Sequence, residues 1–107
     1  MDFLVRIDTT RAYELPADEL QDLVTRERVR GRELMRQGVL RHFWRLPGRR
    51  ANIGIWTAAD ADALEEALES LPIRPYAEID ITPLATHPMT KEAEAEAQAE
   101  AETEAAA

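Results

Sequence analysis

A glutamate inside an apolar helix stripe, Glu27, is the residue of this sequence whose surroundings are best suited to chemistry. Turned at about 100° per residue, segment 20–35 (LQDLVTRERVRGRELM) gathers five neighbours of Glu27 on one stripe: Leu20, Leu23, Val24, Gly31 and Leu34. A helix buries such a stripe, so the carboxylate is directed at the core or at a cavity in it. Gly31, one turn on, leaves room beside it.

Burial without a cationic partner raises the pKa of a carboxylate. A glutamate in that state can carry protons near neutral pH. Two other interpretations stay open, since perturbed groups mark functional sites only statistically: the pattern is accidental, or Glu27 pairs with an arginine inside the fold.

The residues needed for most other kinds of catalysis are missing from this sequence. The chain has no cysteine, which excludes a thiolate nucleophile and a cysteine metal site, and its two histidines, His42 and His87, lie far apart. Its four glycines form no phosphate-binding loop, and the single serine, Ser70, falls at a helix end. Acid–base chemistry without a cofactor remains.

A few polar residues could assist Glu27. His42 shares a predicted strand face with Leu40 and Trp44, so it is either a hydrogen-bonded core or interface histidine or a ligand contact. Asn52 could anchor a ligand oxygen or satisfy backbone beside a turn. Arg30, one turn from Glu27, could hold it ionised or reach a substrate oxygen. Other arginines could bind a carboxylate, which suits the guanidinium fork: Arg41, Arg45, Arg49, Arg50 and Arg74.

The elements that position these residues follow the order βαββαβ. Strands are predicted at 2–8, 39–46, 51–56 and 77–82, from alternating patterns and from the Pro47-Gly48 turn between the middle two. Helices are predicted from Pro16 to about Gln37, before Gly38, and from 57–60 to Ser70. This is the order of ferredoxin-like α+β domains, with both helices on one face of an antiparallel sheet. A partner subunit is the expected cover of the other face.

Size and charge narrow the class of protein further. The 107 residues predict one domain over 1–90, followed by a low-complexity Glu/Ala tail at 91–107 that we expect to be disordered or frayed. The tail holds six glutamates and one lysine, which gives it a net charge of −5. The net charge of the whole chain is −8, so residues 1–90 carry −3. This charge disfavours nucleic-acid binding. Without a signal-like or membrane-spanning stretch, we expect a soluble cytoplasmic protein and no membrane partner.

Several blocks of the sequence resemble the muconolactone Δ-isomerase family over about residues 1–90. They are MDFLVRI at the start, the segment around Glu27, RHFWRLPGRRANIGIW (41–56), SLPIRPY (70–76) and ATHP (85–88). The resemblance implies a cofactor-free enzyme of the catechol branch of the β-ketoadipate pathway. The implied reaction converts muconolactone to the enol-lactone by moving a proton from C4 to C2. The resemblance also implies a large homo-oligomer, a decamer, with pockets near subunit contacts.

In this resemblance Glu27 takes the place of the family's proton-carrying glutamate, and Asn52 and His42 fall on matching motif positions. Three positions depart from the family: Val24 replaces a lysine, Arg50 a tyrosine and Arg74 a phenylalanine. Arg30, Arg50 or Arg74 could supply the missing cation. Equally, the substrate could be a substituted muconolactone or another acidic lactone, or the protein could be a non-catalytic ligand-binding oligomer.

Overall fold

A computed structural model describes residues 1–106 and has the predicted element order. Three segments follow the predictions within a residue or two: β1 (Asp2–Asp8), α1 (Ala17–Arg36) and β2 (Leu40–Arg45). So do the next three: β3 (Ala51–Thr57), α2 (Ala61–Glu69) and β4 (Glu78–Leu84). Two short 3-10 helices, η1 (Thr10–Glu14) and η2 (Arg74–Tyr76), and a terminal helix, α3 (Pro88–Ala106), complete the described chain. The α+β, ferredoxin-like prediction is confirmed.

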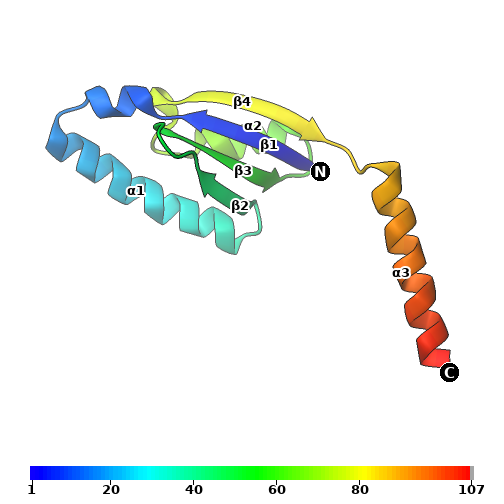
Figure 1. The fold of residues 1–107 in the computed structure, drawn as a ribbon. Helices are drawn as coiled ribbons and strands as arrows, with labels where there is room; N and C mark the ends of the chain where they lie inside the picture. The colour runs from blue at the N-terminus through cyan, green and yellow to red at the C-terminus, as the bar shows by residue number, and fades with distance from the viewer. Residues whose placement is uncertain (107) are drawn as a thin grey trace.

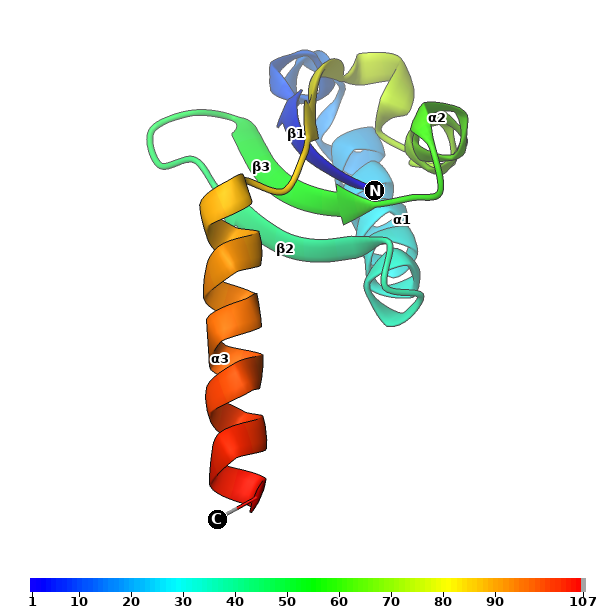
Figure 2. The same cartoon turned by 90° about the vertical axis from the view of Figure 1, so that its right-hand side faces the viewer.

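The four strands form one antiparallel sheet in the order β2-β3-β1-β4, and both α1 and α2 cover the same face (Figures 1 and 2). β1 alternates strictly, so that Phe3, Val5 and Ile7 are buried toward the helices. They pack with the buried leucines of both helices and with Trp56 of β3. This core fixes the helix-facing side of β3 against α1, where Glu27 lies.

A bulge in β2 changes which of its side chains face the helices. Leu40 pairs with Trp56, but the next paired residue, His42, lies opposite Ile55, so Arg41 is the extra residue. Beyond the bulge the alternation is reversed, because successive side chains of a strand point to opposite faces. Phe43 opposite Gly54 therefore faces the helices with Leu40. The prediction that Leu40, His42 and Trp44 share a face is wrong.

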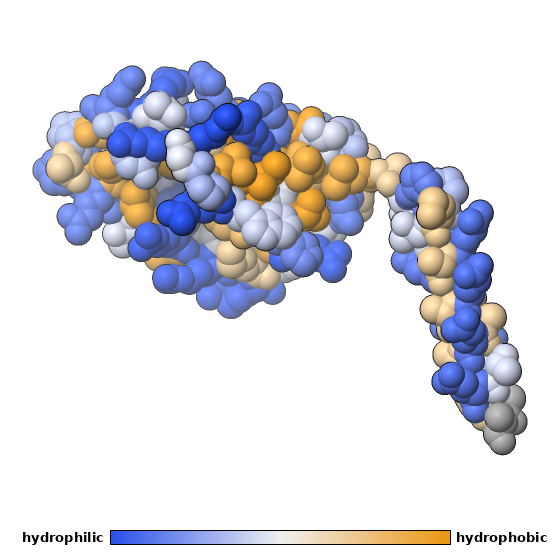
Figure 3. All heavy atoms as spheres, viewed as in Figure 1, coloured by the Kyte–Doolittle hydropathy of each residue, from blue (hydrophilic) through white to orange (hydrophobic). Residues whose placement is uncertain are grey.

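The helix-free face of the sheet carries apolar side chains. Leu4 of β1 lies opposite Ile55 of β3, and Ile53 lies opposite Trp44, which stacks on His42 with ring centroids 5.7 Å apart. Trp44 is 53% exposed in the single chain. In the space-filling view from this side, hydrophobic atoms gather across the sheet (Figure 3). An apolar face of this kind is typical of an interface.

The terminal segment differs from its prediction. Where we expected disorder or fraying, the structure has the continuous helix α3, which projects away from the domain with its described side chains exposed (Figure 1). Alanine and glutamate favour helix, and the E-A alternation spreads charge around it, so it has helical propensity without a face to bury. Within residues 1–106, no helix has both the length and the apolar character needed to cross a membrane.

Candidate active site

A cavity of about 370 Å³ lies between α1 and the sheet, and Glu27 is in its wall. The α1 side also contributes Gly31, while β2 and β3 contribute Phe43, Asn52 and Trp56. The volume falls within the range of about 300–1,000 Å³ that is typical of small-molecule sites. A Cβ built on Gly31 would have nothing within 4 Å, so the predicted space beside Glu27 is present. The sequence pattern and the cavity therefore select the same carboxylate.

Glu27 is half-buried, and one backbone contact holds it in place. Its Oε2 accepts a hydrogen bond of 3.0 Å from the Ile73 N–H. Burial raises the pKa of Glu27, and this effect outweighs the Ile73 hydrogen bond and the charge of Arg26, which both lower it. Among the described residues Glu27 forms no ion pair, because Arg26 pairs with Asp22 at 2.9 Å instead. The predicted alternative of an internal Glu–Arg pair is not seen.

Two buried polar atoms in the cavity wall have no partner in the described part of the chain. They are Oδ1 of Asn52 and Nε1 of Trp56. Both residues lie on the helix-facing side of β3, with Gly54 between them, and a Cβ on Gly54 would come within 3.3 Å of the indole nitrogen. The same Cβ would come within 2.7 Å of the His42 carbonyl oxygen, so the glycine lets β2 approach β3 and also leaves space at the indole edge. An unpaired buried polar group is costly, so these atoms mark a place where a polar ligand or water is needed.

Two arginines that the sequence analysis did not select, Arg28 and Arg32, also line the cavity. Both are exposed on α1 and neither forms an ion pair with any residue among 1–106. The signal was present in the sequence: four residues apart, they form a row beside the row of Glu27 and Gly31. The apolar stripe alone does not include this row, whereas the cavity extends along the flank of the stripe as far as Met35.

The three arginines proposed to replace the family lysine do not line this cavity within one chain. Arg30 donates to Glu33 Oε2 and to Ser70 Oγ, both at 2.9 Å. The guanidinium of Arg50 lies over the Tyr13 ring, 3.8 Å from its centroid. Arg74 pairs with Glu69 at 3.0 Å, in a separate surface hollow. Each already has a partner, so the structure does not bring them to Glu27.

His42 is also absent from the cavity wall, because the β2 bulge turns it to the helix-free face with Trp44. Of the residues predicted to bind substrate, only Asn52 lies with Glu27. The sequence could not reveal this, since a bulge shifts the alternation of a strand without changing the residue types along it.

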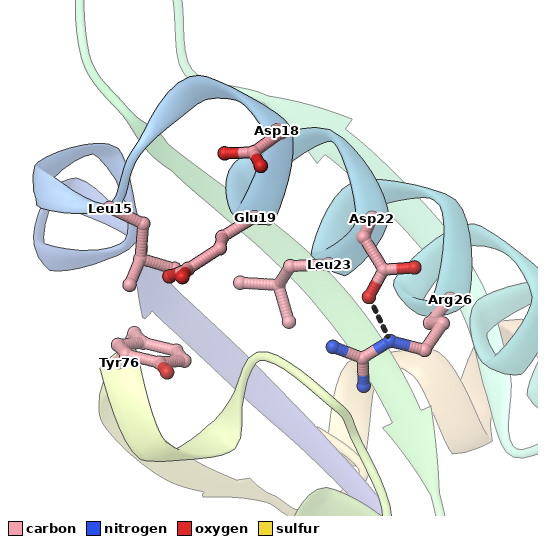
Figure 4. A pocket seen from close by; sticks show the side chains of 7 residues that line it. All are labelled: Leu15, Asp18, Glu19, Asp22, Leu23, Arg26 and Tyr76. Atoms are coloured by element: carbon pink, nitrogen blue, oxygen red, sulfur yellow. Dashed lines mark hydrogen bonds and ion pairs between the residues drawn. The ribbon is translucent and has the colours of Figure 1, made fainter.

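A second hollow, of about 430 Å³, lies at the start of α1 (Figure 4). Asp18, Glu19 and Asp22 surround it, and Figure 4 shows Asp22 paired with Arg26 beside Leu23. Its unpaired charges are carboxylates, which would repel an anionic ligand. It therefore does not compete with the Glu27 cavity for an acidic substrate. Nor does any group of three or more His, Cys, Asp and Glu residues in the described chain form a metal site.

Comparison with known proteins gives one consistent answer. The sequence profile of muconolactone delta-isomerases matches residues 1–90. The chain belongs to the muconolactone Δ-isomerase family. Muconolactone Δ-isomerase of Cupriavidus pinatubonensis is 35% identical over 86 residues, covering 80% of this chain and 94% of that protein. The same enzyme of Pseudomonas aeruginosa is 30% identical over 92 residues, covering 86% and 96%.

The fold agrees with the family assignment. A crystal structure of muconolactone isomerase superposes with a TM-score of 0.71 at 32% identity, covering 82% of this chain and 92% of that chain. The match to the muconolactone Δ-isomerase profile ends at residue 90, so most of α3 lies outside it.

Proposed function

We propose that this protein is an isomerase that converts muconolactone to β-ketoadipate enol-lactone in catechol catabolism, with Glu27 as the proton carrier. The observation that carries the proposal is the Glu27 carboxylate itself. It is half-buried in a cavity of ligand size, it has no ion-pair partner within residues 1–106, and burial raises its pKa. Every relative that we compared carries the same enzyme name.

The reaction needs one base and no cofactor. Ionised Glu27 takes the C4 proton of the lactone ring, and the electron pair moves through the C2–C3 double bond onto the lactone carbonyl oxygen. The resulting dienolate is protonated at C2 by the same carboxylic acid, which leaves a C3–C4 double bond and an ionised Glu27. A carboxylate with a raised pKa is a stronger base than one in water, and its conjugate acid is still acidic enough to protonate the dienolate at C2.

The dienolate oxygen needs hydrogen-bond donors. Asn52 and Trp56 lie in the same cavity wall as Glu27, and the amide NH₂ and the indole N–H are both donors. The Trp56 Nε1 is buried and has no hydrogen-bond partner among the described residues, so a ligand oxygen that reached the cavity floor would satisfy it. We assign these two residues to the lactone carbonyl, where preorganised donors stabilise developing negative charge.

The decisive experiment measures loss of muconolactone by ultraviolet absorbance with wild-type, Glu27→Gln and Glu19→Gln proteins. In Glu27→Gln the introduced amide oxygen can still accept the Ile73 hydrogen bond, so the fold is kept, but the amide cannot take a proton. We expect this variant to lose at least about 1,000-fold in kcat, within the range attributed to a positioned general base plus its electrostatic role. Glu19→Gln, on the same helix but in the other hollow, should match wild type. Full activity in folded Glu27→Gln would refute the role of Glu27.

Substituted muconolactones are the second candidate substrates, and the structure gives one reason to rank them below muconolactone. None of the three departures from the family, Val24, Arg50 and Arg74, lines the cavity within one chain. A panel of chlorinated and methylated muconolactones should therefore give lower kcat/KM than the parent compound. A higher value for any of them would reassign the substrate.

We also propose that the protein acts as a homo-oligomer, a decamer, in the cytoplasm. The support is the apolar helix-free face of the sheet, where Ile53 and Ile55 are half-buried and Trp44 is exposed in a single chain. Replacing Ile55 by Glu should reduce the mass measured by analytical ultracentrifugation. A monomeric wild-type protein at micromolar concentration would contradict the proposal.

A further inference from the structure

The cavity changes in character from its rim to its floor. At the rim, Arg28 and Arg32 of α1 are exposed cations, while Glu27 is half-buried behind them. The floor holds Trp56, which is 2% exposed and fully enclosed in the core. A ligand that fits this order has an anionic group at one end and an uncharged, polarisable ring at the other.

Of the five arginines of α1, two pair with acidic side chains among residues 1–106 and three do not: Arg28, Arg32 and Arg36. Arg26 and Arg30 hold acidic side chains, Asp22 and Glu33, at 2.9 Å. Arg28 and Arg32 have no acidic partner within residues 1–106, although the same helix offers carboxylates. Their only carboxylate neighbour in the cavity wall is Glu27, whose raised pKa argues against strong pairing with either. Both residues line the cavity and are exposed, and neither has an acidic partner among residues 1–106 that would compete with a ligand.

We propose that Arg28 and Arg32 form a clamp for the free carboxylate of the substrate and select lactones that carry one. The inference rests on the proposed function, because it takes the lactone acid as the ligand. Guanidinium binds carboxylate with charge-assisted, often bidentate hydrogen bonds, and two residues four apart on a helix present neighbouring side chains. With the carboxymethyl group held at the rim, the ring lies inward, toward Glu27, Asn52 and Trp56.

The clamp also offers a replacement for the lysine that the family resemblance implies at position 24. Val24 stands at that position, and the arginines expected to compensate, Arg30, Arg50 and Arg74, are engaged elsewhere. Arg28 and Arg32 supply two positive charges about one and two turns further along the same helix. This placement leaves Glu27 without a direct ion pair, which a cation beside it would form and which would lower its pKa.

The test compares Arg28→Gln, Arg32→Gln and the double variant with the control Arg36→Gln. Arg36 is an exposed α1 arginine that changes the net charge equally but does not line the cavity. We expect KM for muconolactone to rise about tenfold in each single variant and about 100-fold in the double variant, with kcat within a few-fold. Arg36→Gln should behave as wild type. Arg28→Lys should recover part of the loss, since lysine keeps the charge but not the fork.

Two further readouts separate a clamp from a structural role. Wild type should prefer muconolactone to its methyl ester by about 100-fold in kcat/KM, and the double variant should lose this preference. The KM of wild type should also rise with ionic strength, because the rim is solvated and salt screens it, while the double variant should show little dependence. Variants that keep the acid-over-ester preference of wild type would overturn the proposal.

A binding experiment distinguishes failure of the clamp from failure of the proposed reaction. Glu27→Gln protein, with and without the two arginine substitutions, is titrated calorimetrically with muconolactone. Binding that disappears with the arginines supports the clamp even if wild type shows no turnover, and in that case only the isomerase proposal falls. Equal binding by both proteins, or binding by neither, refutes the clamp whatever the turnover of wild type.

Discussion

Gly31 offers the sharpest test that the space beside Glu27 serves the reaction, because stability and activity should change in opposite directions. Glycine inside a helix costs about 1 kcal/mol relative to alanine. A Cβ at this position would meet no atom within 4 Å, so Gly31→Ala should recover that energy without strain. For a domain of this size, about 1 kcal/mol corresponds to an increase of about 4–8 °C in Tm. The sequence therefore gives up stability at this one helical position.

A longer side chain at position 31 should block the cavity. Helical side chains point back toward the preceding turn, so a leucine there would cover the region of Glu27 and Arg28. We expect Gly31→Leu to keep most of the stability gain, since leucine is also a strong helix former. Turnover of muconolactone should fall by roughly 100-fold or more, the loss expected when a substrate is displaced from its reactive position. Gly31→Ala should lose less.

The assay pairs thermal unfolding with initial rates, at one protein concentration, because subunit assembly would make Tm depend on concentration. Val29→Leu is the matched control: it also places leucine on α1, but at a residue that is 50% exposed on the far side of the helix and absent from the cavity wall. It should leave turnover unchanged. Undiminished turnover in a folded Gly31→Leu protein would show that the substrate does not occupy this cavity.

Three further predictions concern Glu27 and the terminal helix. Because burial raises the pKa of Glu27, the folded state holds the Glu27 proton more tightly than the unfolded state does. The contribution of Glu27 to stability is therefore complete at low pH, and it is lost as pH rises through the pKa of the folded state. Glu27→Gln should therefore have a higher Tm than wild type at pH 8, with a smaller difference at pH 4, and equal Tm values at pH 8 would contradict the buried carboxylate. The kcat/KM of wild type, which reports the free enzyme, should fall as pH drops through the same raised pKa, since only ionised Glu27 accepts the C4 proton, and a flat acid limb would argue for another base. Truncation after residue 90 should change neither Tm nor kcat, because the described side chains of α3 are exposed, and a loss of activity would assign the tail a role.

The sequence predicted the fold well because its strongest patterns are local. The alternation of Phe3, Val5 and Ile7 defines β1, and the apolar stripe through Leu23 and Leu34 defines the buried face of α1. The same stripe located Glu27 in the wall of a cavity, since the position of a residue on a helix determines which way it points. These inferences need only the periodicity of one element at a time.

The cavity as a whole could not be predicted, because it depends on how elements meet. The bulge at Arg41 sends Phe43 into the cavity wall and His42 away from it, and no residue type in β2 announces this change. The partners of two arginines are set in the same way. Arg30 contacts Ser70, which is distant in sequence, and Arg74, beyond the end of α2, pairs with Glu69. An arginine is free to bind substrate only when its neighbours leave it unpaired, and that is a property of the packed chain.

The positions of the cavity arginines also affect Glu27, the proposed base. A cation next to Glu27 would bind the substrate carboxylate but would also lower the pKa of the base and weaken it. The chain separates binding of the substrate carboxylate from proton transfer, because exposed Arg28 and Arg32 lie at the cavity rim and half-buried Glu27 lies behind them. In the proposed reaction, substrate charge would then be neutralised at the exposed rim, while the proton moves beside the half-buried Glu27 carboxylate. A cation placed closer to Glu27, as in Val24→Lys, should therefore lower the pKa of Glu27. The acid limb of the pH profile should then move to lower pH, while KM should improve little.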